Sequence, residues 1–101
     1  SSAASDVYKR QQYSFDRAFL GSCGVDMTDF AVTTSGVEDG LTKKAAVQSS
    51  RHKYVVMERE KFYFNESYKY THFDDISGII TDEFPDDTIV NILRNTGVKL
   101  L

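Results

Sequence analysis

The feature that most constrains this chain is a set of short apolar runs, each ending on glycine or on charged residues. They are FDRAFL (Phe15–Leu20), YVVM (Tyr54–Met57) and ISGIIT (Ile76–Thr81). Each run is too short for a typical helix, and the last two are rich in β-branched or aromatic side chains. FDRAFL alternates before a glycine-containing turn, as a strand does, and YVVM and ISGIIT are typical of strands buried inside a sheet. We therefore expect strands whose carboxyl ends carry glycine or polar residues.

Helices are expected around these strands. The first should begin near Gly36, because Ser35 followed three residues later by Glu38 is a capping-box pattern, and it should run to about Arg51. The second should span about Asp86–Asn95, with acidic residues in its first turn and a glycine just past its end.

The remaining segments complete the order of elements. Val25–Thr34 shows no helical period and is interpreted as a loop, and the aromatic-rich stretch Phe62–Phe73 as a loop with room for one short strand. Val98–Leu101 begins a last strand. The order strand, helix, strand, strand, helix, strand predicts an α/β fold with a mainly parallel sheet and flanking helices. Residues 1–12 are interpreted as a non-native or disordered leader, outside a domain that occupies residues 13–101.

Composition narrows the class of protein. The chain has 101 residues, a formal net charge of −3 and 41% hydrophobic residues, which is typical of a globular domain. No stretch concentrates lysine and arginine, so these residues are not expected to bind nucleic acid themselves. The single cysteine cannot form an intramolecular disulfide, and no apolar run approaches the roughly 20 residues that cross a bilayer. A cytoplasmic protein with no membrane contact is expected.

Candidate ligand-binding residues follow from the geometry of such a sheet. In an open α/β sheet, ligands bind in the crevice at the carboxyl ends of the strands. The predicted strand ends carry Gly21–Asp26, Glu58–Lys61 and Thr81–Asp82. A glycine-containing turn, a lysine and carboxylates suit a small polyol that bears a negative charge. In this interpretation Lys61 binds the anion, and Asp26 or Asp82 binds hydroxyl groups.

Each of these residues also has a purely structural interpretation. Lys61 would then be an ordinary exposed lysine, Asp82 would end a strand and start a turn, and Asp39 would interact with the dipole at a helix start. Cys23 is expected to be a small residue in a crowded turn, since no neighbouring base would activate it. No cluster of residues resembles a metal site and the glycines are too sparse for a dinucleotide fingerprint, so no catalytic residue, metal or cofactor is predicted.

Segments along the chain resemble, in order and spacing, the sensor domain of the DeoR family of transcriptional regulators. They are AFLGSCGVD (18–26), TTSGVEDGLTKKA (33–45), VVMEREKF (55–62) and IITD (79–82). The resemblance implies a fold similar to that of ribose-5-phosphate isomerases and coenzyme A transferases, and a phosphorylated sugar as the effector. It also implies a homo-oligomeric repressor that contacts DNA only through an N-terminal helix-turn-helix. That domain and the first half of the sensor have no counterpart here, so the chain is expected to be the C-terminal part of the sensor.

The resemblance also implies roles for particular residues. Lys61 would contact the effector, Asp26 would line its pocket, Asp39 stands where the family has glutamate, and Lys43 matches the helix lysine that follows. The full candidate effector-binding set is Gly24, Asp26, Asp39, Lys43, Lys61 and Asp82.

The chain departs from the family pattern at two places. Glu60 replaces a hydroxyl-bearing residue beside Lys61, which adds a negative charge that would weaken phosphate binding. Ala31 stands where the family usually has a glycine.

Two alternatives remain beside the binding module. One is a sugar-phosphate isomerase or transferase of the same fold, which would use paired carboxylates and a lysine for proton transfer. Isomerases that this fold resembles carry a Lys-Gly-Gly-Gly run at the corresponding place, whereas residues 31–36 of this chain read AVTTSG. This difference disfavours the enzyme. The other is an oligomerisation element, for which the aromatic stretch Phe62–Phe73 would provide the surface.

Overall fold

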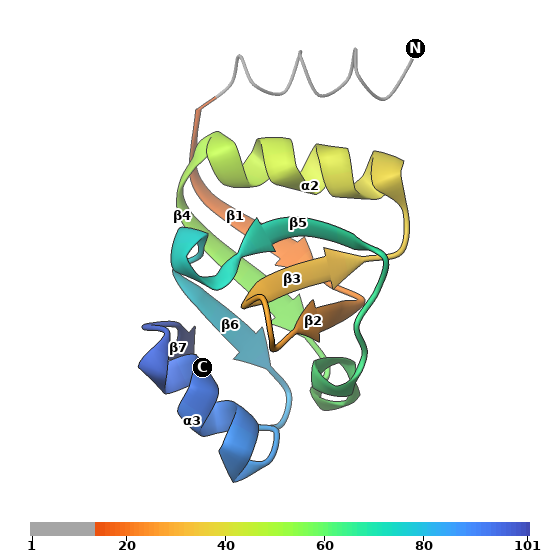
Figure 1. The fold of residues 1–101 in the computed structure, drawn as a ribbon. Coiled ribbons are helices and arrows are strands. Elements are labelled where there is room, and N and C mark those ends of the chain that lie inside the picture. The colour runs from red at the N-terminus through yellow and green to blue at the C-terminus, as the bar shows by residue number, and fades with distance from the viewer. Residues whose placement is uncertain (1–13) are drawn as a thin grey trace.

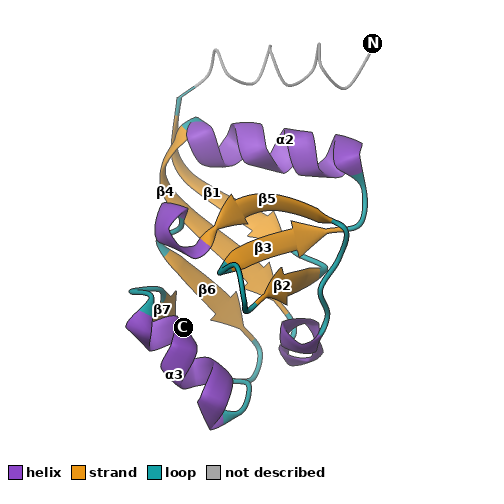
Figure 2. Ribbon diagram, viewed as in Figure 1, coloured by secondary structure: helices purple, strands orange, loops and turns teal. Residues whose placement is uncertain are grey.

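A computed structural model describes residues 14–101, so the predicted leader at residues 1–12 lies outside the described residues. These residues form two sheets and two α-helices (Figures 1 and 2). The elements, in chain order, are β1 (Phe15–Gly21), β2 (Gly24–Asp26), β3 (Ala31–Thr34), α2 (Val37–Gln48), β4 (Ser50–Met57), η1 (Arg59–Tyr63), β5 (Tyr68–His72), η2 (Phe73–Asp75), β6 (Gly78–Thr81), α3 (Asp87–Asn95) and β7 (Lys99–Leu100), where η marks a 3₁₀ helix.

The larger sheet confirms the predicted α/β class. Its strands lie in the order β1-β4-β6-β7, and every neighbouring pair is parallel. In register, Gly21 of β1 lies beside Val56 of β4, and Val56 lies beside Ile80 of β6. The carboxyl ends of these three strands therefore meet at one edge of the sheet, as parallel pairing requires.

The interpretation of Val25–Thr34 as a loop is wrong. Strands β2 and β3 form an antiparallel hairpin there, and β5 extends it to a second sheet in the order β2-β3-β5. The hairpin was invisible in the sequence because all four residues of β3 are buried, including Thr33 and Thr34, so that no alternation of polar and apolar residues marks the strand. The short strand allowed within Phe62–Phe73 is confirmed as β5, although its antiparallel partner was not foreseen.

Both predicted helices are present, but only one of them has the N-terminal cap that the sequence predicts. Helix α3 follows the prediction: the Asp86 carboxylate accepts a hydrogen bond from the Ile89 N–H, and Gly97 follows the helix with a positive φ of 82°. Helix α2 begins after Gly36 and ends at Gln48, earlier than predicted. The expected capping box is not formed, because Gly36 itself is the N-cap residue and has no side chain to accept a hydrogen bond.

The core fills the space between the parallel sheet and a second layer that contains the small sheet, α2 and α3 (Figure 1). Val55 and Ile79 point into this space from the parallel sheet, and Tyr70 and Leu93 meet them there from the second layer. In the part of the chain that the structure describes, no helix is long and apolar enough to span a membrane.

The opposite face of the parallel sheet is not covered by any described residue. Its side chains alternate with the buried ones along each strand, and Phe19 is 60% exposed and Val56 43% exposed. The Phe19 and Tyr54 rings stack on this face with their centroids 5.5 Å apart. We call this surface the open face and define it by Phe15, Phe19, Tyr54, Val56 and Ile80.

Candidate functional site

A cavity of about 270 Å³ lies at the carboxyl ends of the parallel strands. We call it the strand-end cavity. It takes residues from each of the three strand ends that the sequence singled out: Gly21, Ser22, Val56, Met57, Glu58, Lys61 and Asp82. Of the predicted effector-binding residues, Lys61 and Asp82 line it.

Asp82 holds the segment that carries Lys61. The Asp82 carboxylate accepts a hydrogen bond from the backbone N–H of Arg59 at 2.9 Å, so the end of β6 is tied to the start of η1. The Arg59 guanidinium in turn donates to the Phe84 carbonyl at 3.0 Å. The Lys61 ammonium lies 5.5 Å from the centre of the Phe64 ring, which is within range of a cation–π contact. Asp82 therefore has a positioning role in addition to lining the cavity.

The charges around Lys61 are mostly negative. Glu60 and Asp82 both act on Glu58, whose pKa is raised by its hydrogen bond with Glu60 and by the negative charges of Glu60 and Asp82. Lys61 acts in the opposite direction on the same carboxyl group. The rim of the strand-end cavity thus offers one cation among several hydrogen-bond acceptors, an arrangement that favours a ligand with hydroxyl groups beside its anionic group.

Asp39 and Lys43 form a second cluster. Their side chains make an ion pair of 2.8 Å, and the Thr34 hydroxyl donates to the same Asp39 oxygen at 2.8 Å. The Cys23 sulfur lies 3.6 Å from the Thr34 hydroxyl. The Lys43 ammonium favours the ionised carboxylate, which lowers the pKa of Asp39, and the hydrogen bond with Thr34 lowers the pKa of Cys23. Neither Asp39 nor Lys43 lines the strand-end cavity.

Tyr70 connects this cluster to the strand-end cavity. The Lys43 ammonium lies 5.7 Å from the centre of the Tyr70 ring, and the Tyr70 hydroxyl donates to the Gly21 carbonyl at 3.3 Å. Burial of the phenol raises the pKa of Tyr70 well above its usual range, so the hydroxyl stays a donor. Gly21 itself lines the cavity. The two clusters are thus neighbours joined through one buried hydroxyl.

Gly24 and Asp26 are engaged in holding the small sheet. Gly24 is buried, and a side chain there would overlap the backbone carbonyl of Phe64. The Asp26 carboxylate accepts hydrogen bonds from the N–H groups of Thr28 and Asp29, both at 2.9 Å, and these bonds lower its pKa. Asp26 therefore closes the β2–β3 turn. Neither Gly24 nor Asp26 lines the strand-end cavity.

Ser22 and Tyr70 were not among the candidate binding residues, although Ser22 lies within the predicted strand-end segment Gly21–Asp26. Ser22 lines the cavity, and its hydroxyl lies 2.8 Å from the Gly24 carbonyl and 3.0 Å from that of Thr33. Its place directly after a predicted strand was a usable signal. Tyr70 gave no such signal, because it lies among many aromatic residues in a segment whose partner strand was not recognised. Within residues 14–101, no group of three or more His, Cys, Asp or Glu side chains is arranged to hold a metal ion.

Comparison with known proteins places the chain in a family. The model of the DeoR C-terminal sensor domain matches residues 2–83. The HTH-type transcriptional repressor GlcR of Bacillus subtilis (strain 168) is 26% identical over 98 residues, which are 97% of this chain and 37% of that protein. The HTH-type transcriptional regulator FruR of the same organism is 32% identical over 90 residues, which are 89% of this chain and 35% of that protein. The chain thus spans just over a third of the length of these curated relatives.

Proposed function

This chain belongs to the DeoR C-terminal sensor domain family, and we propose that it binds a phosphorylated sugar and so controls how the full-length protein acts at DNA. The observation that carries the proposal is the strand-end cavity, in which Lys61 and Asp82 meet the Gly21–Ser22 turn. A lysine, a carboxylate and a hydroxyl-bearing turn are complementary to a ligand that combines a phosphate with hydroxyl groups.

Lys61 binds the phosphate in this proposal. It is the cation that lines the cavity, and its ammonium group supplies up to three hydrogen-bond donors to phosphate oxygens. Asp82, Glu58 and the Ser22 hydroxyl accept hydrogen bonds from the sugar hydroxyls. The carboxylates around Lys61 reduce affinity for a bare phosphate and select for a ligand that uses them as acceptors.

Asp39 and Lys43 support the site indirectly. They lie beside Tyr70, whose hydroxyl bonds the Gly21 carbonyl at the cavity wall. A ligand that shifts Gly21 acts on Tyr70 and through it on α2, which carries Asp39 and Lys43. Gly24 and Asp26, which were expected to touch the effector, instead support it by fixing the small sheet.

A regulator is favoured over an enzyme. The relatives are named as a helix-turn-helix repressor and a helix-turn-helix regulator, and the chain matches just over a third of each. We propose that effector occupancy shifts the sensor between two conformations and that a helix-turn-helix domain elsewhere in the full-length protein responds to the shift. A cytoplasmic homo-oligomer fits this role.

The test is a thermal-shift panel of hexose and pentose phosphates against the full-length protein, with the unphosphorylated sugars as ligand controls. A binding phosphosugar at about 100 times its Kd should stabilise the protein by roughly 2.7 kcal/mol. Lys61→Gln should abolish most of this shift. Lys99→Gln is the matched control, because Lys99 is an exposed lysine that does not line the cavity.

Either of two results would overturn the proposal. One is that no phosphosugar raises the wild-type midpoint more than its unphosphorylated sugar does. The other is that Lys61→Gln responds as fully as Lys99→Gln, which would remove the lysine from the site.

A further inference from the structure

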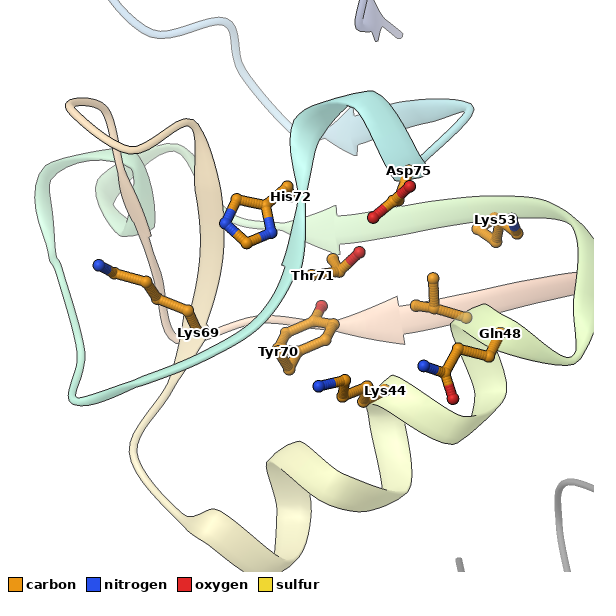
Figure 3. Close-up of a pocket in the computed structure, with 9 residues that line it drawn as sticks. Lys44, Gln48, Lys53, Lys69, Tyr70, Thr71, His72 and Asp75 are labelled. Atoms are coloured by element: carbon orange, nitrogen blue, oxygen red, sulfur yellow. The ribbon is translucent and has the colours of Figure 1, made fainter.

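We propose that the chain has a second anion-binding site, in a cavity of about 450 Å³ between α2, β4 and β5. We call it the α2–β5 cavity. Figure 3 shows the side chains around it: Lys44 and Gln48 come from α2, Lys53 from β4, Lys69 to His72 from β5, and Asp75 from η2, with Val47 completing the lining. Its volume lies within the range of sites that hold small molecules. It shares no lining residue with the strand-end cavity, so the proposal stands independently of the proposed function.

The balance of charge in the lining favours an anion. Among the described residues of the lining, three are lysines, Lys44, Lys53 and Lys69, and one is acidic, Asp75. Lys69 is already neutralised, because its ammonium group pairs with Asp29 and with Asp26 at 3.5 Å. Among residues 14–101, Lys44 and Lys53 make no ion pair. In a chain whose net charge is −3, the cavity therefore gathers two cations without an ion-pair partner, from two separate elements, against the one carboxylate of Asp75.

The other groups in the lining define the rest of the ligand. Among residues 14–101, β5 is an edge strand of the small sheet, and four of its residues, Lys69 to His72, line the cavity. Asp75 is an acceptor that would bind a hydroxyl group. The chemical class is thus a small oxyanion, phosphate or carboxylate, that also carries a hydroxyl group.

The experiment follows backbone amide shifts by NMR in the full-length protein during titration with inorganic phosphate and, separately, with malonate. Binding should move the amides of Lys44, Thr71 and His72 in a saturable way, and the tighter of the two ions identifies the preferred oxyanion. The Kd is fitted to the chemical-shift changes of those amides. The double variant Lys44→Gln/Lys53→Gln should raise this Kd about fivefold, because it removes two partly exposed charge contacts with the ion. Lys61→Gln should leave it unchanged, which separates this site from the strand-end cavity.

A variant that is expected to tighten binding shows that weaker binding in the lysine variant is not caused by misfolding. Asp75→Asn removes the single carboxylate of the lining and should tighten the binding of both ions about twofold. The proposal is overturned if the double lysine variant binds with the wild-type Kd. It is equally overturned if phosphate and malonate move only amides around Lys61, or if Asp75→Asn weakens binding.

Discussion

Gly24→Ala should destabilise the protein far more than its small size suggests. An added Cβ would lie 2.7 Å from the Phe64 carbonyl carbon, closer still to its oxygen, and 3.1 Å from the Thr33 hydroxyl oxygen. Two of these atoms are backbone, and the same Phe64 carbonyl accepts a hydrogen bond from the Val25 N–H at 2.7 Å. The chain cannot relieve the overlap by rotating a side chain. It must move η1 away from β2.

The expected cost can be worked from two contributions. Overpacking a filled site costs roughly 1–3 kcal/mol, and weakening the Val25–Phe64 hydrogen bond costs about 1 kcal/mol more. The sum is about 2–4 kcal/mol, which for a domain of this size lowers the melting temperature by roughly 10–25 °C. Urea denaturation followed by circular dichroism measures the free energy of unfolding directly.

Gly21→Ala is the matched control for this change. Gly21 lies three residues earlier in the same turn, and a Cβ there would meet nothing within 4 Å. It should change the free energy of unfolding by less than about 0.5 kcal/mol. If Gly24→Ala falls within that same limit, or if the two variants are equally destabilised, the packing role assigned to Gly24 is refuted.

Further outcomes follow from other contacts. Tyr70→Phe removes the hydrogen bond to the Gly21 carbonyl and should lower the free energy of unfolding by about 0.5–1.5 kcal/mol in urea denaturation; an unchanged value would show that the bond contributes nothing. The pKa of Asp39 is lowered mainly by Lys43, so the ion pair stabilises the protein above the ordinary carboxyl pKa and is lost as pH falls through the lowered one. In an NMR titration, Lys43→Ala should move the Asp39 midpoint upward, and no movement would contradict the pairing. Asp86→Ala removes the N-cap of α3 and should lower the melting temperature more than Asp86→Asn, which keeps an acceptor oxygen; equal losses would argue against capping.

Much of the parallel sheet could be predicted from the sequence, because its strands are buried on at least one face and are rich in residues that favour strands. Val55 and Ile79 lie at the centre of the predicted runs and are fully buried. The small sheet could not be predicted. Its strand β3 buries threonines as well as alanine and valine, and its partner β5 follows it by more than thirty residues in a stretch crowded with aromatics.

The same limit applies to the candidate sites. The rule that ligands bind at the carboxyl ends of parallel strands was enough to select Lys61 and Asp82, which line one cavity. The same rule selected Gly24 as part of the turn Gly21–Asp26, but the packing of Gly24 against Phe64 depends on a contact forty residues away that no local pattern reveals. The α2–β5 cavity could not be predicted from the sequence, because it lies where α2 packs on the small sheet, and that sheet was not predicted.

Val56 belongs to two surfaces at once. It is part of the open face, and it also lines the strand-end cavity. Any surface that covers the open face would therefore also change how enclosed that cavity is. A ligand that prefers the enclosed cavity would strengthen the covering contact, and the covering contact would strengthen ligand binding by the same factor. Assembly of the protein through the open face would therefore be thermodynamically linked to ligand occupancy of the strand-end cavity, and Val56 would be the side chain that the two share.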